Sequence, residues 1–184
     1  MSQLRIAVIV GSLSKQSINR QLGQGLAALM QDKADFEFID ISRLPVYNRD
    51  FDNTPDFKPF DDLKPLIRGC NGVLFVTPEY NRSIPGVLKN AIDNASRPYG
   101  QSAWADKPAG VIGVSIGTIG TAMAQQHLRN VLVFLNMPTM AQPEAFIQNS
   151  DALFNADGSI GEVIRAFLQA WMDSYVAWVK RHNA

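Results

Sequence analysis

Three short stretches of the chain carry residue types that could bind an anionic ligand containing a planar ring. The first, GSLSKQSINR at residues 11–20, begins with a glycine and is rich in hydroxyl groups. The second, TPEYN at residues 77–81, places a carboxylate, an aromatic ring and an amide on consecutive positions. The third, SIGTIG at residues 115–120, carries two glycines, which allow a backbone to approach a ligand closely.

The first stretch has the composition of a phosphate site. Gly11 ends the apolar run Ile6–Val10, and apolar residues recur at helical spacing after Ser17. A strand, a small-residue turn and a helix direct backbone N–H groups and the positive end of a helix dipole at one place. The stretch is neither a Walker A nor a G-x-G-x-x-G motif, which favours a monophosphate. A plain turn with a serine cap explains the same residues.

The other two stretches are also open to two interpretations. Residues 78–81 could cover a planar heterocycle and bond its edge through the backbone and Asn81. A proline-rich turn with Tyr80 on the surface would have the same composition. The glycines of the third stretch suit close contact with a ligand, but an ordinary strand-to-helix turn would also use them.

Strand-like and helix-like segments alternate along the chain. Strands are expected at 6–10, 36–41, 72–76, 109–116 and 139–147, the last weakened by Pro143. Helices are expected at 18–29, 61–68, 85–95, 121–136 and from 160 onward, and residues 44–60 read as a surface loop. This alternation predicts one α/β domain, residues 1–184, with a doubly wound sheet of five parallel strands. In such a sheet the three stretches leave the carboxyl ends of strands, where ligands bind.

The composition favours a soluble protein without nucleic-acid or membrane partners. The 17 basic and 17 acidic residues cancel, so no charge imbalance points to nucleic acid or an anionic membrane. No signal peptide is expected, and no apolar stretch approaches the roughly 18 residues needed to span a bilayer. Cys70 is the only cysteine, which suits a reducing compartment, so we expect a cytoplasmic protein.

Several other residues have unremarkable interpretations. His127 and His182 have no second ligand at metal spacing, so we expect no metal site. Cys70 is expected to be a buried small side chain. An apolar stripe at helical spacing is expected to form the core side of the closing helix: Ile164, Phe167, Leu168, Trp171, Tyr175, Trp178 and Val179. The aspartates of the 44–62 region are expected to be solvated. The helix at 121–135 is apolar on more than one face, which indicates a subunit interface.

The three stretches, extended, resemble a known family. GSLSKQSINR at 11–20, TPEYNRSIPGVLKNAID at 77–93 and GTIGTAMAQQHLRNVLVFL at 117–135 are similar to the NAD(P)H-dependent FMN reductases, in particular the bacterial quinone and chromate reductase branch. The resemblance covers most of residues 4–147. It implies a flavodoxin-like fold with strand order 2-1-3-4-5, noncovalent FMN, NADPH or NADH as hydride donor, and a homodimer or homotetramer.

The resemblance also implies which residues meet the cofactor. Ser12, Ser17 and Asn19 would hold the FMN phosphate, with Gly11 and Ile18 in the same part of the site. Residues of the second stretch would line the ribityl chain and the isoalloxazine ring, and residues of the third would meet the ring from the other side: Pro78, Glu79, Tyr80, Asn81, Ser115 and Gly117. No side chain is expected to act as a catalytic acid or base, because the flavin carries the chemistry.

Three positions depart from the family pattern. Family members often have arginine where this chain has Ser14, a second glycine where it has Thr121, and tryptophan where it has Asn94. Lys15 or Arg20 could replace a missing cationic phosphate contact at position 14.

The expected activity is an FMN-dependent oxidoreductase that passes a hydride from NAD(P)H to small-molecule acceptors. Quinones are the first candidates; chromate, azo compounds and free flavin are others. One alternative is a flavodoxin-like electron carrier that does not oxidise NAD(P)H, although such carriers are strongly acidic and this chain is neutral. The other alternative is a phosphate-binding α/β module without a redox role.

Overall fold

A computed structural model describes residues 3–54 and 63–184 of the chain. Its five-stranded sheet has the order β2-β1-β3-β4-β5, and each neighbouring pair is parallel. In chain order the elements are β1 (Leu4–Val10), α1 (Ile18–Leu29), β2 (Ala34–Phe38), the 3-10 turn η1 (Arg49–Phe51), α2 (Leu63–Arg68), β3 (Gly72–Val76), α3 (Gly86–Ala95), β4 (Ala109–Ser115), α4 (Ala122–Phe134), β5 (Phe146–Gln148) and α5 (Glu162–Arg181). The expected fold class and strand order are confirmed.

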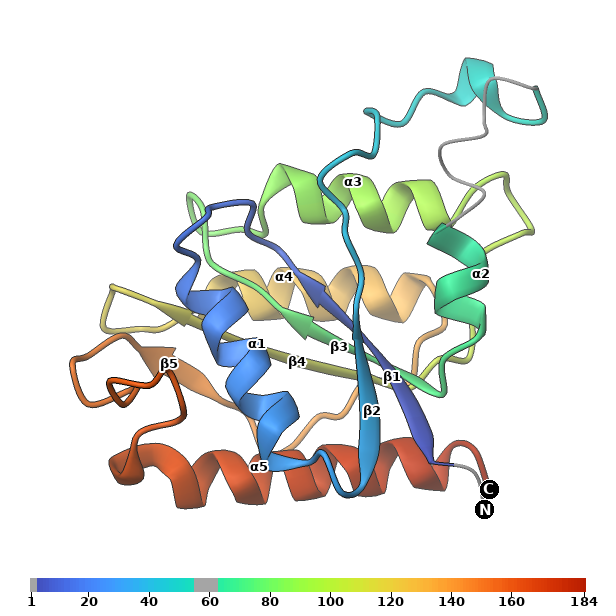
Figure 1. Cartoon of the computed structure of the whole chain (residues 1–184). Coiled ribbons are helices and arrows are strands. Elements are labelled where there is room, and N and C mark those ends of the chain that lie inside the picture. Colours follow the sequence, from blue (N-terminus) through green and yellow to red (C-terminus); the bar gives the residue numbers. More distant parts are fainter. Residues whose placement is uncertain (1–2, 55–62) are drawn as a thin grey trace.

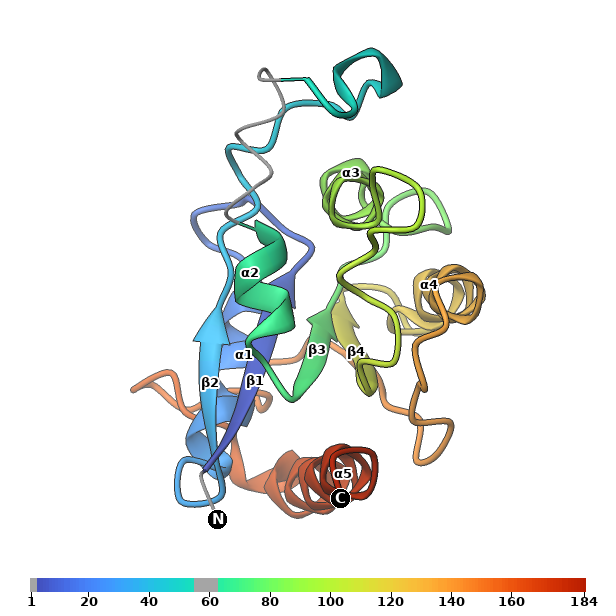
Figure 2. The same ribbon diagram turned by 90° about the vertical axis from the view of Figure 1, so that its right-hand side faces the viewer.

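Helices cover both faces of the sheet (Figure 1). Helices α1 and α5 lie on one face and α2, α3 and α4 on the other, as the end-on view of Figure 2 shows. The interior strand β1 serves both layers, because its alternate residues point to opposite faces. Ile6, Val8 and Val10 belong to the core under α1 and α5, whereas Ala7 and Ile9 belong to the core under α3 and α4.

The closing helix α5 follows its predicted apolar stripe with one exception. Trp171, Tyr175 and Val179 are buried against the sheet, and Trp171 donates from Nε1 to the carbonyl oxygen of Pro143 at 2.9 Å. Phe167 was expected in the same stripe but is 45% exposed. The stripe therefore identifies the buried face correctly and overestimates its width near the start of the helix.

Strand β2 ends earlier than its sequence suggests. Ile39 still donates to Val8 at 3.0 Å, but the Asp40 carboxylate then accepts the backbone N–H of Ser42 at 2.9 Å. This side-chain bond turns the chain away from the sheet, as aspartate does in turns. Ile39 and Ile41 are buried without being part of the strand.

The fifth strand is correctly located but broken. Residues 138–140 pair with Ala109: Ala109 donates to Pro138 at 2.9 Å, and Met140 donates to Ala109 at 2.8 Å. Pairing resumes only at β5, after Pro143, which has no N–H to give to a ladder.

The expected loop at 44–60 and the helix at 61–68 are seen in part. Residues 55–62 lie outside the described part, so the start of the helix at Asp61 and its neighbour Asp62 cannot be compared. The described part of this helix, α2, begins at Leu63.

The three loops meet at one edge of the sheet. They follow β1, β3 and β4, which are neighbours, and parallel strands bring their carboxyl ends to the same side. The chain reverses its winding direction between β1 and β3, which is where open α/β sheets bind ligands. Gly113 permits close packing behind this edge, since an added Cβ would overlap the Thr77 carbonyl oxygen and lie 2.6 Å from Thr121 Oγ1.

Candidate functional site

The first loop forms a cradle of hydroxyl and N–H groups at the start of α1. Ser17 is the N-cap, and its Oγ accepts the backbone N–H of Arg20 at 3.1 Å. Ser12 Oγ accepts the N–H of Ser14 at 3.4 Å, and Ser12 and Ser17 are both buried. The first turn of α1 contains no acidic residue, so its positive dipole end is not neutralised from within the helix. Two hydroxyls and free N–H groups of this kind suit a phosphate.

Gly11 lets this loop start in close contact with the second loop. Its N–H still donates to Val76 at 2.9 Å, and an added Cβ would lie 3.2–3.3 Å from atoms of Leu88, Thr77 and Pro78. Those distances are tighter than ordinary contacts, so a side chain here would push the first two loops apart.

Asn19 has a different main role from the one expected. It is 1% exposed, its Nδ2 donates to Val114 O at 2.8 Å, and its Oδ1 accepts Val114 N–H at 3.0 Å. The amide therefore ties α1 to β4, and only one N–H of Nδ2 is left for a phosphate. Ile18, also expected at the site, packs its side chain against the core, so only its backbone can face a ligand.

The side chain of Glu79 caps a helix. Its Oε2 accepts the backbone N–H groups of Met123 at 3.0 Å and Ala124 at 3.1 Å, at the start of α4. The N-cap residue Thr121 makes no such bond itself. The Glu79 side chain is only 9% exposed, with Arg82 3.7 Å from its other oxygen. A carboxylate thus occupies the positive end of α4, which makes this helix start unsuitable for a second anion.

A tight turn presents the aromatic residue of the second loop. Tyr80 and Ser83 exchange backbone hydrogen bonds of 2.9 and 3.0 Å, and Asn81 and Arg82 both have positive φ, at 51° and 66°. These angles are those of a type I′ turn. Pro78, where the loop leaves β3, is buried, whereas Tyr80 is 53% exposed.

His127 joins this turn from α4. Its Nδ1 lies 3.0 Å from Ser83 Oγ, which fixes the far end of the turn. From the sequence, His127 was expected only not to bind a metal, and nothing in the local pattern pointed to Ser83.

The third loop is closed by its own serine. The Ser115 hydroxyl donates to the Gly120 carbonyl, and Gly120 N–H donates to Gly117 O at 3.0 Å. A Cβ on Gly117 would meet only Ser115 Oγ, at 3.8 Å, so the backbone there is open to an approaching group.

Thr121 and Gln125 support the third loop through a buried hydrogen bond that the sequence did not reveal. Both are fully buried, and Gln125 Nε2 donates to Thr121 Oγ1 at 2.9 Å and to Ala145 O at 2.8 Å. The departure from a second glycine at position 121 therefore adds an anchor between the loop and the segment before β5.

Asn94, the third departure, lies away from this edge. It is fully buried near the end of α3, and its Nδ2 donates to Asn90 O at 2.9 Å and Pro45 O at 3.2 Å. It therefore holds the loop before η1 against α3.

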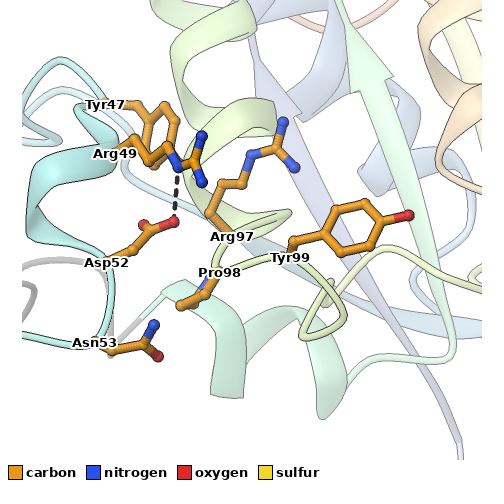
Figure 3. Close-up of a pocket in the computed structure, with 7 residues that line it drawn as sticks. All are labelled: Tyr47, Arg49, Asp52, Asn53, Arg97, Pro98 and Tyr99. Carbon is orange, nitrogen blue, oxygen red and sulfur yellow. Dashed lines mark hydrogen bonds between the residues drawn. The ribbon is translucent and has the colours of Figure 1, made fainter.

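A cavity of about 670 Å³ lies beyond the end of α3, not at the carboxyl edge (Figure 3). It is lined by Tyr47, Arg49, Asp52, Asn53, Arg97, Pro98 and Tyr99. The Tyr47 hydroxyl donates to Asp52 Oδ2 at 3.0 Å, and burial raises the pKa of that hydroxyl. None of the residues expected to meet the cofactor lines this cavity.

The carboxyl edge therefore brings together the residues expected from all three stretches. Gly11, Ser12 and Ser17 lie on the first loop, residues 78–81 on the second, and Ser115 and Gly117 on the third. Of the expected side chains, those of Ile18, Asn19 and Glu79 are engaged mainly in holding the loops in place. Which groups touch a ligand stays a prediction.

Comparison with known proteins agrees with this geometry. Residues 4–152 match the family described as NADPH-dependent FMN reductase. A 2-hydroxy-1,4-benzoquinone reductase from a Burkholderia species is 50% identical over 179 residues, which are 96% of this chain and 97% of that protein.

Solved structures show the same fold. FerB, a flavoenzyme NAD(P)H:(acceptor) oxidoreductase from Paracoccus denitrificans, has a TM-score of 0.90 at 44% identity, covering 97% of this chain and 98% of that one. A flavodoxin from Pseudomonas aeruginosa has a TM-score of 0.64 at 16% identity, covering 96% and 99%. The fold is therefore flavodoxin-like.

The role of Asn19 can be tested without any ligand. Asn19→Ala should lower the free energy of unfolding of the flavin-free chain by about 2 kcal/mol or more, because two buried backbone groups of Val114 lose their partners. Urea unfolding measures this change. Ser12→Ala, in the same cradle, serves as the control and should cost less than about 1 kcal/mol. A flavin-free Asn19→Ala chain as stable as the wild type would show that the tie to β4 is unimportant.

Proposed function

The chain belongs to the NADPH-dependent FMN reductase family, and from this premise we propose that it passes a hydride from NADPH or NADH, through noncovalently bound FMN, to quinones. The proposal rests on a difference between two helices that begin at the same edge of the sheet: the N-terminus of α4 is capped by a carboxylate, and that of α1 is not. The start of α4 is occupied by the Glu79 carboxylate, whereas the first turn of α1 carries hydroxyls and no acidic side chain. Of these two helix starts, that of α1 is therefore the more favourable place for a phosphate.

The three parts of FMN can be assigned to the three loops in turn. We assign the phosphate to Ser12, Ser17, the remaining N–H of Asn19 and the backbone from Gly11 to Ile18. The ribityl chain and the ring then extend toward the second and third loops, which adjoin the first because β1, β3 and β4 are neighbours. When bound, FMN supplies a ring that accepts a hydride and hands electrons on to the acceptor.

The protein's contribution is binding and orientation. The turn at Tyr80–Ser83 and the closed loop 115–120 are each held by internal hydrogen bonds, so they present fixed backbone groups to a planar ring. Gly117 leaves room for that ring to lie against the backbone. Backbone dipoles fixed in this way stabilise negative charge on a bound ring without rearranging. No described side chain at the edge is needed as an acid or base for this role.

Quinones are the proposed acceptors because of the relatives. The 50% identical protein is named for reduction of 2-hydroxy-1,4-benzoquinone, and FerB is named only for an unspecified acceptor. The exposed Tyr80 ring at the mouth of the edge suits a flat, apolar acceptor. Chromate, azo compounds and free flavin are further acceptors to be assayed beside quinones.

An electron carrier without NAD(P)H oxidation is the second candidate, since the flavodoxin shares the fold. That likeness, at 16% identity, concerns the fold alone. Carriers that dock redox proteins use strong charge, and this chain has a formal net charge of zero. The reductase is therefore the better supported of the two.

Rapid mixing of the flavin-loaded protein with NADPH tests the proposal. The oxidised-flavin absorbance should disappear under anaerobic conditions, and adding 1,4-benzoquinone should restore it, because the same site serves donor and acceptor. NADH is mixed in parallel to measure the donor preference. Absorbance that stays unchanged with both nucleotides would leave the electron carrier as the explanation.

We also propose that the protein works in the cytoplasm as one FMN-binding domain that forms homo-oligomers through α4. Two neighbouring apolar side chains on this helix, Val133 and Phe134, are 73% and 76% exposed. Beside them a groove of about 610 Å³ runs between α3 and α4. Adjacent exposed apolar groups next to a groove are typical of subunit interfaces. Among the described residues, no helix is long and apolar enough to cross a membrane.

Phe134→Glu should reduce the native mass to that of a monomer in sedimentation analysis, because it places a charge in the proposed interface. Val163→Glu is the control, since Val163 is 86% exposed on α5, away from α4. A wild-type monomer, or equal masses for wild type and Phe134→Glu, would contradict an interface on α4.

A further inference from the structure

A second cavity adjoins the proposed phosphate cradle on the side of β2. Its volume is about 420 Å³, within the range of about 300–1,000 Å³ typical of small-molecule sites. Figure 2 shows the loop after β1 beside the chain that leaves β2, and the cavity lies between these two segments. Its lining residues are Leu13, Ser14, Lys15, Arg20, Phe38, Ile39, Asp40 and Ser42.

The cavity is continuous with the cradle along the chain. Leu13, Ser14 and Lys15 stand between Ser12 and Ser17, the two cradle serines, and Arg20 donates its backbone N–H to Ser17 Oγ. The loop that forms the cradle therefore also lines this cavity on its β2 side. The small side chain of Ser14 leaves the entrance open.

The charges of the cavity suit one further phosphate. Lys15 and Arg20 form no ion pair or side-chain hydrogen bond with any residue in 3–54 or 63–184. The one carboxylate in the lining is Asp40, so the formal charge of the lining is +1. Two cations beside one anion attract a singly charged phosphate group.

The remaining surface suits a nucleoside. Leu13 is 48% exposed and Phe38 is half-buried, which gives apolar surface for a flat base. The hydrogen bond from the Ser42 N–H lowers the pKa of Asp40, so its carboxylate is ionised at neutral pH and can accept from an amino group or from sugar hydroxyls.

We propose that this cavity receives the adenosine monophosphate half of FAD, so that the flavin site binds FAD as well as FMN. The first phosphate occupies the cradle, the second lies toward Lys15 and Arg20, and the adenosine lies between Leu13 and Phe38. This inference rests on the proposed function, because it extends the same flavin site. It assigns Lys15 and Arg20 to the second phosphate of FAD, in place of the FMN phosphate contact that the sequence suggested for one of them.

Calorimetric titration of the flavin-stripped full chain with FMN and with FAD tests the inference. The wild type should bind FAD with a dissociation constant within about tenfold of that for FMN. Lys15→Gln and Arg20→Gln should each weaken FAD binding about tenfold and FMN binding less than about threefold, because only FAD places a phosphate beside them.

Two further variants make the result specific. Phe38→Ala removes the apolar wall of the cavity outside the cradle, so it should weaken FAD binding about tenfold and leave FMN binding unchanged. Arg49→Gln removes a cation that lines the other cavity and should change neither affinity.

The possible failures can be told apart. FMN binding without FAD binding, or an equal loss of both in Arg20→Gln, would overturn this inference and leave the proposed function intact. Binding of neither flavin by the wild type would overturn the proposed function itself.

Discussion

The bond between Glu79 and the start of α4 organises the candidate site. Its carboxylate joins the second loop to the helix that follows the third, so two of the three loops move as one unit. It also neutralises the positive end of α4, so an anion is favoured more at the start of α1 than at the start of α4. The same arrangement thus sets the shape of the edge and the direction in which a phosphate-bearing ligand must lie.

The tie between Asn19 and Val114 completes this frame from the other side. It links the first helix to β4, the strand that carries the third loop, across 95 positions of sequence. Together the two side chains connect all three loops through hydrogen bonds that involve no ligand. A site built in this way is formed before the cofactor arrives, which reduces the ordering cost of binding.

The sequence predicts most of the strands and loops of the site, but few of the side-chain hydrogen bonds that hold the loops together. Apolar runs such as Ile6–Val10 identify buried parallel strands, because these must be apolar on both faces. The loops at their carboxyl ends follow from topology. Local patterns could not reveal that Glu79 caps a distant helix or that Gln125 anchors Thr121, because such bonds depend on three-dimensional proximity. The break before β5 follows Pro143, whose effect was visible in the sequence but whose extent was not.

Comparison of FMN with riboflavin tests most directly whether the α1 cradle binds the phosphate of FMN. The two ligands share the ring and the ribityl chain and differ only in the phosphate. Titration of the flavin-stripped chain should give FMN an affinity at least about 100-fold higher than riboflavin, the value of about two charge-assisted hydrogen bonds. Equal affinities would contradict the account, because the cradle would then make no contribution to binding.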